Sequence, residues 1–386
     1  MSQLLARTLA ATAVLCLTLT ACGGGVPDTG APAPAAPDPL DTAPTAELVE
    51  RARQEGQVVV YSFTSRIAQV EAEFERTYPG VDLLATDISS TEQIARIRAE
   101  AEAGSPGADV AYLSDAPVVL DELLADGMVR NYVPPRIAGS VPDRFREPLL
   151  ASRLSTKTLM YNEEAHPAGP PVTNLWELTD PQWRGRVVMV DPQVRGDYLD
   201  LMTEVVLRSP EMDEAHRALR GGPVVLGDGI GSAGEQWIAD LYANDVVLVG
   251  DTDEVNAAVG ARGQQDPPVG FTTYSDRRDN ENRALQAATG VAPAPGIAFP
   301  ALLGVTPDAA HPAAARLLVD FLMGDGSPDG GPGFAPFYVP GDYPTRTDVV
   351  PPSGAVPLAE LGAWTIDPAV VAGRRGDVAD LILTLG

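Results

Sequence analysis

The chain has 386 residues, 45% of them apolar and 21% charged, which is enough for two domains of ordinary size with substantial cores. Its formal net charge of −26 excludes the positive surface on which nucleic-acid binding depends, and it argues against attraction to anionic lipid. Two cysteines (Cys16 and Cys22) and three widely separated histidines argue against a disulfide framework and a histidine-rich or zinc–thiolate metal site.

The first 22 residues have the features of an export signal. Arg7 supplies a positive charge, and the apolar run from Thr8 to Thr20 is too short to span a bilayer. The run ends in Leu19-Thr20-Ala21-Cys22, which resembles the lipobox of bacterial lipoproteins. The resemblance implies that residues 1–21 are a signal peptide and that Cys22 receives a diacylglyceryl group, which anchors the chain outside the cytoplasm. The alternative is an ordinary signal peptide with a chance cysteine.

Residues 22–46 are rich in Gly, Pro and Ala and are expected to form a flexible tether. From residue 57 strands and helices alternate. Strands are predicted at 58–61, 81–86 and 109–113. A helix follows each of them: the first ends at Pro79-Gly80, the second opens with a capping box from Ser90 to Gln93, and the third has Asp115 as N-cap. This order predicts a parallel sheet with helices on both faces.

A second α/β series follows. Short strands are predicted at 159–161, 187–190, 224–226, 246–249 and 269–274, and Ser232 to Glu235 is a capping box for a further helix. A strand at 297–305 and an amphipathic helix at 312–323, closed by Gly324, complete the series. The Gly- and Pro-rich segment beyond residue 326 is expected to wrap over an existing lobe.

Several phrases resemble one known family. They are Gly56–Ser62, Phe74–Val81, Ala108–Val110, Met160–Asn162, Leu175–Thr179 with Trp183–Val187, and His311–Ala315 ahead of Phe321-Leu322. In this order and spacing they resemble the substrate-binding lipoproteins of bacterial ABC importers, which have the type 2 periplasmic-binding fold, and in particular the group similar to ferric-ion-binding proteins. The resemblance covers about residues 56–325.

The resemblance implies an α/β fold of two lobes, each a mainly parallel sheet flanked by helices, with the ligand in the cleft between them. Lobe one would comprise residues 47–157 and 299–386, and lobe two residues 158–298, with crossing strands near 157–161 and 297–303. Such a fold closes by a hinge. The family also implies a monomer without a cofactor or chemistry of its own, and an ABC permease with its ATPase as partners.

Candidate ligand-binding residues follow from a general rule: in open α/β sheets, ligands lie beyond the carboxyl ends of the strands, near helix N-termini. For any single hydroxyl, helix capping is an alternative explanation. The rule selects Ser62, Thr64, Ser65, Asp87, Ser89, Ser90 and Ser114 in lobe one, and Asp191, Arg195, Tyr198, Gly231, Ser232, Tyr274, Ser275 and Arg277 in lobe two.

The segment from Tyr274 to Arg278 bears on the ligand. It falls near the place where ferric-binding relatives carry two adjacent tyrosines, hard anionic ligands that suit Fe³⁺. Here Ser275 follows Tyr274, so the pair is incomplete, although Tyr274 would be the metal ligand if iron is bound and Tyr61, Tyr198 or Tyr338 could substitute. Arg277 and Arg278 favour a ligand with carboxylate or phosphate groups, unless they pair with the neighbouring Asp276 and Asp279.

Other functions have weaker support. Gly229 to Gly234 matches G-x-G-x-x-G with Asp251 downstream, which suggests a dinucleotide-binding oxidoreductase, but the glycines begin several residues after the predicted strand. A hydrolase would need a motif such as G-x-S-x-G or HExxH, which the sequence lacks. A purely structural lipoprotein, or one for a cationic solute such as a polyamine, stays open. The favoured prediction is a lipid-anchored protein that delivers a small anionic solute to an ABC importer, with ferric iron as the alternative ligand.

Overall fold

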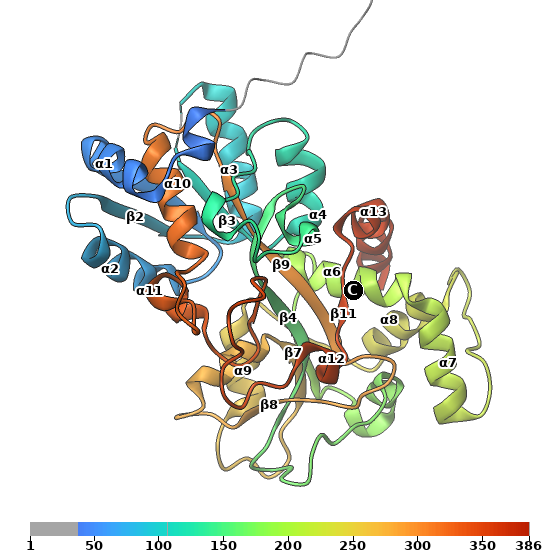
Figure 1. Ribbon diagram of the computed structural model, residues 1–386. Coiled ribbons are helices and arrows are strands. Elements are labelled where there is room, and N and C mark those ends of the chain that lie inside the picture. The colour runs from blue at the N-terminus through green and yellow to red at the C-terminus, as the bar shows by residue number, and fades with distance from the viewer. Residues whose placement is uncertain (1–37, 106, 386) are drawn as a thin grey trace, which may run out of the picture. The chain divides into compact units, whose positions relative to one another are not determined.

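The computed structural model describes residues 38–105 and 107–385, so the expected signal peptide and Cys22 lie outside the described residues. A single sheet runs through the molecule in the order β2-β1-β3-β9-β4-β7-β5-β6 (Figure 1). Its strands are β1 (Gln57–Ser62), β2 (Asp82–Asp87), β3 (Val110–Leu113), β4 (Leu150–Asn162), β5 (Val187–Val190), β6 (Val247–Val249), β7 (Val269–Thr272) and β9 (Gly296–Val305), and three short strands join it at the side, β8 (Leu285–Ala287), β10 (Tyr343–Pro344) and β11 (Trp364–Thr365).

The pairing divides this sheet into two parallel groups. Strands β2, β1 and β3 are parallel to one another, and so are β7, β5 and β6. The long strands β4 and β9 lie between the groups and pair antiparallel with each other. Both long strands therefore link the two groups, and they contain the segments predicted to cross, near residues 157–161 and 297–303.

Helices cover both faces. The main ones are α1 (Thr45–Glu55), α2 (Ile67–Thr77), α3 (Ser90–Ala103), α6 (Gly196–Leu207), α7 (Ser209–Arg220), α8 (Ala233–Ala243), α9 (Thr252–Gly260), α10 (Pro312–Leu322) and α13 (Pro368–Leu385). Short ones are α4 (Ala116–Val118), which continues into the π-helical turn η2 (Val119–Leu124), α5 (Asp143–Arg146), α11 (Gly331–Phe334), α12 (Leu358–Leu361), and the 3₁₀ turns η1 (Pro39–Thr42), η3 (Pro135–Ile137), η4 (Leu175–Thr179), η5 (Pro181–Trp183), η6 (Tyr274–Asp279) and η7 (Ala335–Phe337).

Buried apolar side chains form three clusters, two of which lie on opposite faces of β1 and β3 and are together called the first core. The first core contains residues 40–151 and 301–337, with α1, α2 and α10 on one face of its strands and α3 on the other. The second core contains residues 159–299 and 361–382. Strands β4 and β9 contribute side chains to both, so they are the structural link between the two cores.

The C-terminal segment adds to this framework without forming a unit of its own. Strand β10 pairs with β4, and β11 pairs with β9. The last helix, α13, packs against α6 and α8 and also touches α4 (Figure 1). Its Val371, Val378 and Ile382 belong to the second core. The prediction that this segment wraps over existing structure is confirmed, although its 18-residue helix was not predicted.

Several local predictions need correction. Residues 224–226 are not a strand, and Val225 is 84% exposed. The capping box of α3 lies one residue earlier than predicted, between Ser89 and Glu92. Asp115 precedes α4 but does not cap it, since its carboxylate pairs with Arg375.

The expected tether also needs correction at its end. Residues 39–42 form η1, and Leu40 is buried in the first core. Asp38 and Asp41 both form ion pairs with Arg316 of α10. An apolar contact and two ion pairs thus hold this part of the predicted tether against the folded chain.

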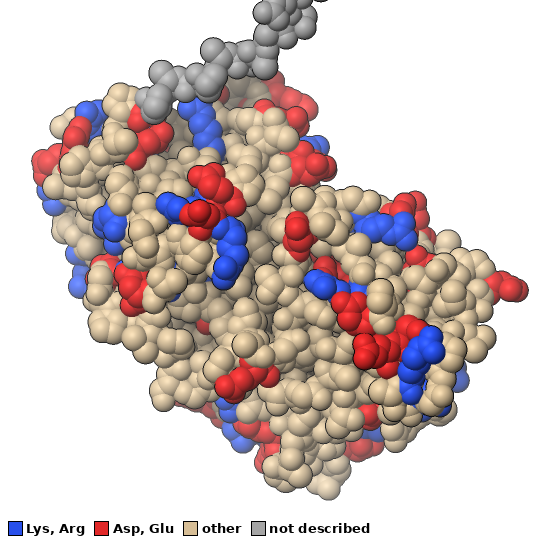
Figure 2. Space-filling model, turned by 45° about the vertical axis from the view of Figure 1, so that its right-hand side comes forward, with Lys and Arg blue, Asp and Glu red and all other residues tan. Residues whose placement is uncertain are grey.

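The surface carries charges of both signs. On the face drawn in Figure 2, acidic and basic side chains are interspersed. Among residues 38–105 and 107–385, no helix combines the length and the apolar character that crossing a bilayer requires.

Candidate functional site

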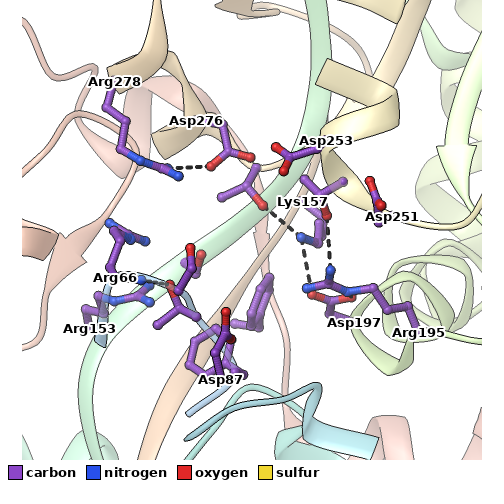
Figure 3. Close-up of a pocket in the computed structure, with 17 residues that line it drawn as sticks. Arg66, Asp87, Arg153, Lys157, Arg195, Asp197, Asp251, Asp253, Asp276 and Arg278 are labelled. Atoms are coloured by element: carbon purple, nitrogen blue, oxygen red, sulfur yellow. Dashed lines mark hydrogen bonds and ion pairs between the residues drawn. The ribbon is translucent and has the colours of Figure 1, made fainter. Parts of the chain in front are cut away.

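A cavity of about 280 Å³ lies where β4 and β9 pass between the two cores (Figure 3). Three parts of the chain line it: the loops after β1 and β2, the crossing strands, and loops of the second core. The lining residues are Phe63, Thr64, Ser65, Arg66, Asp87, Arg153, Ser155, Lys157, Arg195, Asp197, Asp251, Thr252, Asp253, Thr273, Asp276, Arg278 and Phe299.

The floor of the cavity is one face of β4. Arg153, Ser155 and Lys157 occupy alternate positions of the strand, and alternate side chains of a strand point to the same side. Phe299 of β9 pairs with Ser155 in the ladder and completes the floor. Because the whole of β4 is buried, these charged side chains have little water around them.

Arg66 and Arg153 form the first cationic cluster, which we call cluster A. Both guanidinium groups pair with Asp342, at 2.5 Å from Arg66 Nη1 and 2.8 Å from Arg153 Nη1. The side chains of Arg153 and Asp342 are fully buried. Arg153 Nη2 and Arg66 Nε are also buried and have no hydrogen-bond partner among the described residues. Two cations in cluster A therefore share one carboxylate.

The C-terminal segment carries Asp342 into cluster A. Strand β10 follows it directly and pairs with the β4 residues Arg153 and Leu154. Gly341 has a φ of 98° and lies so close to η6 that a Cβ atom would sit 2.4 Å from the amide nitrogen of Ser275. A glycine is required there, because only glycine adopts this backbone without strain and leaves room for the neighbouring chain.

Lys157, Arg195 and Asp197 form cluster B. Lys157 Nζ donates to Thr273 Oγ1 at 2.7 Å and lies 3.2 Å from Asp197 Oδ2, while Arg195 Nε lies 3.4 Å from Asp197 Oδ1. Burial by itself would raise the pKa of Asp197, but Lys157 and Arg195 outweigh it and lower that pKa. Burial lowers the pKa of Lys157, and Asp197 opposes the shift. Here too, two cations share one carboxylate.

The other charged residues of the cavity differ in their surroundings. Arg278 pairs with Asp276, which also accepts a hydrogen bond from Asn256 at 2.7 Å, so this pair is neutral overall. Asp87, Asp251 and Asp253 are exposed at the rim. Asp251 caps α9 through its Oδ1 atom. Five cations thus line the cavity, together with the largely buried carboxylates Asp197 and Asp276 and three exposed carboxylates at the rim, while Asp342 lies behind cluster A. Within clusters A and B taken together, four cations face two carboxylates.

Four of the residues predicted from the sequence line this cavity: Thr64, Ser65, Asp87 and Arg195. The other candidates in the first core take part in local hydrogen bonds. Ser62 Oγ donates to the carbonyl oxygen of Thr64, Ser89 caps α3, and the hydroxyls of Ser90 and Ser114 bond to each other at 3.0 Å. These serines shape the loops around the cavity without lining it.

The remaining candidates in the second core also lie outside the lining. Tyr198 is fully buried, and its hydroxyl donates to the carbonyl oxygen of Phe271. Asp191 accepts the amide of Gln193, and Ser232 caps α8. Arg277 donates to the carbonyl oxygen of Leu285 and pairs with Glu163 at 3.4 Å. Of the two adjacent arginines, only Arg278 faces the cavity (Figure 3).

Tyr274 and Ser275 are completely buried, and their hydroxyl oxygens have no partner among the described residues. Neither residue lines the cavity, and no tyrosine is among the lining residues. In the described part of the chain, no group of three or more His, Cys, Asp and Glu side chains is arranged to hold a metal ion.

The glycine-rich segment at 229–234 has an internal explanation. The amide of Gly231 donates to Glu235 Oε2, and that of Gly234 donates to Ser209 Oγ. A Cβ atom at position 234 would lie 2.3 Å from the carbonyl oxygen of Val205, so this glycine allows α8 to pack closely on α6. The residues before the motif are not a strand, whereas a dinucleotide-binding loop follows one.

Comparison with known proteins identifies the fold. Residues 59–327 match the family model described as bacterial extracellular solute-binding protein. Iron-bound HitA from Pseudomonas aeruginosa superposes with a TM-score of 0.65 at 18% identity, covering 86% of this chain and 99% of that protein. AfuA from Actinobacillus pleuropneumoniae with fructose-6-phosphate gives 0.63 at 20% identity, covering 85% and 97%.

A third solved structure, AgtB from A. tumefaciens R10 with agropinic acid, has a TM-score of 0.60 at 14% identity and covers 86% of this chain and 98% of its own. No curated protein sequence matched the chain. The fold is therefore that of the type 2 periplasmic binding proteins of the ferric-binding type. The ligands named in these three structures differ, so the fold by itself does not identify the ligand of this chain.

Proposed function

Because the chain belongs to the bacterial extracellular solute-binding protein family, we propose that it captures a small organic anion bearing carboxylate or phosphate groups and delivers it to an ABC importer. The observation that carries this proposal is the excess of cations over carboxylates within clusters A and B, in the cavity between the cores. An anion that enters would supply the missing negative charge.

The location of these charges makes the excess significant. Two unit charges 4 Å apart attract by about 4 kcal/mol at an effective dielectric constant near 20, but by only about 1 kcal/mol in bulk water. Arg153 and Lys157 are almost completely buried, so their interactions are weakly screened. The exposed rim carboxylates are screened by water and salt, so they oppose an anion much less strongly.

We further propose that the two cores are lobes that close on the solute by bending of β4 and β9. Lobe one would comprise residues 47–157 and 299–386, and lobe two residues 158–298. The cavity would then have lining residues on both lobes, which supports closure upon binding. The helix α13 is an exception to these bounds, because it packs with the second core and would therefore move with lobe two.

We also propose that the protein is anchored to the membrane through acylated Cys22 and acts as a monomer. Its partners would be the permease of the importer and the ATPase of that permease. The lipobox-like sequence before Cys22 supports the anchor. The mass of the N-terminal peptide from membrane-extracted protein tests it, because a diacylglyceryl adduct on Cys22 is expected. No catalytic role is proposed.

The test of ligand class is native mass spectrometry of the purified protein, followed by calorimetric titration with organic carboxylates and phosphate esters. Co-purification or saturable binding of an organic anion is expected, and Arg153→Gln should weaken it at least tenfold. Failure of every organic anion to bind would contradict the proposal. Glu50→Gln, which alters only an exposed ion pair with Arg53, is the matched control.

Ferric iron is the second candidate, because iron-bound HitA has the same fold. For this chain the candidate would need Tyr274 to leave its buried position, or other oxygen ligands to replace it. Addition of ferric citrate should then produce a visible charge-transfer band that Tyr274→Phe abolishes. We expect no such band.

A further inference from the structure

We propose that the natural ligand carries two separate anionic groups, one held by cluster A and the other by cluster B. The inference rests on the proposed function and names its substrate class more closely: a small two-ended dianion, such as a dicarboxylate or a phosphorylated carboxylic acid. Its basis is the way in which the uncompensated charge is divided within the cavity.

The two clusters lie at opposite sides of the cavity. Arg153 and Lys157 are four residues apart on β4, which at about 3.3 Å per residue places their Cα atoms about 13 Å apart. The head group of Arg153 is held in the first core by Asp342 and the hydroxyl of Tyr112, whereas that of Lys157 is held in the second core by Asp197 and Thr273. Figure 3 shows Arg66 and Arg153 on one side and Lys157 with Arg195 on the other.

The excess charge is shared evenly between these sides. Each cluster has two cations and one carboxylate, so each retains one positive charge. The Arg278–Asp276 pair contributes no excess. A ligand with a single anionic group could neutralise only one cluster and would leave the other unmatched beside the closed cavity. Two anionic groups separated by a short spacer match both.

Unsatisfied polar atoms support the same assignment. In cluster A, Arg153 Nη2 and Arg66 Nε are buried without a partner, and such groups cost free energy until an acceptor or a counter-charge approaches. In cluster B, Arg195 pairs with Asp197 through Nε and donates to Thr252 Oγ1 through Nη1, but its side chain remains 28% exposed and can meet a ligand directly. Each end of the cavity therefore has unused capacity for an anion.

The cavity also limits the size of the ligand. Its volume of about 280 Å³ is at the lower end of the range for small-molecule sites. The Phe299 ring and the Ser155 side chain lie on the floor between the clusters, and neither carries a charge. Such a floor suits a short carbon chain that links the two anionic groups.

The experiment is a calorimetric comparison of matched acids with the full-length protein. The probes are succinate, glutarate and adipate, each set against the monocarboxylate of the same chain length, together with inorganic phosphate. We expect at least one diacid to bind tenfold or more tightly than its monoacid and more tightly than phosphate. The spacer length that binds best then measures the separation of the two anion sites.

Two variants test whether each cluster binds one anionic group. Arg153→Gln leaves Arg66 paired with Asp342, and Lys157→Gln leaves Arg195 paired with Asp197, so each removes one excess charge and keeps a neutral pair. Each should reduce the affinity of the best diacid at least tenfold, toward that of the monoacid. Monoacid binding should fall strongly in one variant at most. Arg184→Gln, in an exposed pair with Asp245, is the control and should change neither.

The outcomes distinguish failure of the two-ended ligand from failure of the proposed function. If monoacids or inorganic phosphate bind as tightly as every diacid, the two-ended ligand is refuted, while the proposal of an anionic solute stands. The same conclusion follows if both variants weaken monoacid binding equally. If none of these anions binds and iron does, the proposed function itself fails. The comparison of acids with the unmodified protein decides the matter even if a variant does not fold.

Discussion

Asp342→Asn is the most informative single substitution. Asp342 is fully buried and is the only carboxylate paired with Arg66 and Arg153 among the described residues. The change removes one negative charge but keeps the shape of the side chain, so two buried guanidinium groups lose their counter-charge together. Removing one partner of a buried ion pair costs about 3–5 kcal/mol, and we expect a loss of stability of this size.

The same variant should become dependent on anions. With Asp342 neutral, cluster A has two uncompensated charges, so a small inorganic anion can bind where the carboxylate stood. Binding to the folded state stabilises it by RT ln(1 + [L]/Kd), about 2.7 kcal/mol when the anion is present at 100 times its Kd. Added sulfate should therefore restore much of the lost stability.

The assay is urea unfolding followed by circular dichroism, in chloride and in sulfate at equal ionic strength. Sulfate stabilises most proteins to some extent, so a control is needed. Asp377→Asn removes an exposed ion pair with Arg374 and should change stability by less than about 1 kcal/mol in either salt. The reasoning is refuted if Asp342→Asn is as mild as this control, or if sulfate stabilises both variants equally.

Four further predictions concern Asp200, Lys157, Gly234 and the binding of NAD. Burial and the neighbouring Asp115 raise the pKa of Asp200 well above its ordinary value. The folded protein therefore loses stability as the pH rises above the unfolded-state pKa of this carboxyl, which is near 4. Asp200→Asn should raise the melting temperature at pH 7 but not at pH 4. Burial lowers the pKa of Lys157, which faces Asp197, Arg195 and Asp276. Lys157 therefore loses its charge at alkaline pH, and the affinity for anions measured by calorimetry should fall there. Lys157→Gln should not show this fall. Gly234→Ala should destabilise the protein by about 1–3 kcal/mol in urea unfolding, because the added Cβ atom would meet a carbonyl oxygen of α6. NAD should leave the melting temperature of the unmodified protein unchanged.

The order of strands was largely predictable from the sequence. Apolar runs such as Val58–Tyr61 and Val187–Val190 are buried on both faces, and this environment leaves a continuous apolar signal. Residues 224–226 have the same local signal but form no strand, and Val225 and Leu226 are exposed. Whether an apolar run becomes a strand depends on a partner that the local sequence does not reveal.

The cavity was only partly predictable. The strand-end rule selected Thr64, Ser65, Asp87 and Arg195, which lie in loops at the cavity. It missed Arg153 and Lys157 because they lie in the interior of a crossing strand. The alternation of Arg153, Ser155 and Lys157 was a usable signal, since residues two and four positions apart in a strand share one face, and two of these three are charged.

Asp342 had no such local signal. Its role depends on contact with Arg66 and Arg153, which are 276 and 189 residues away in the chain. The Gly- and Pro-rich segment around it has no periodicity that predicts its position. Long-range ion pairs of this kind become visible only when the tertiary structure brings the partners together.

Lys157 is the only lysine in the chain, and its ammonium group lies at the cavity floor. Protein enriched with ¹⁵N at the lysine ζ position, or with ¹³C at the lysine ε position, would therefore give one side-chain resonance in a magnetic resonance spectrum, without any assignment step. That resonance would report occupancy of the cavity by any solute, even in a crude mixture of metabolites. A natural single-site reporter of this kind makes the search for the physiological ligand possible without labelling chemistry.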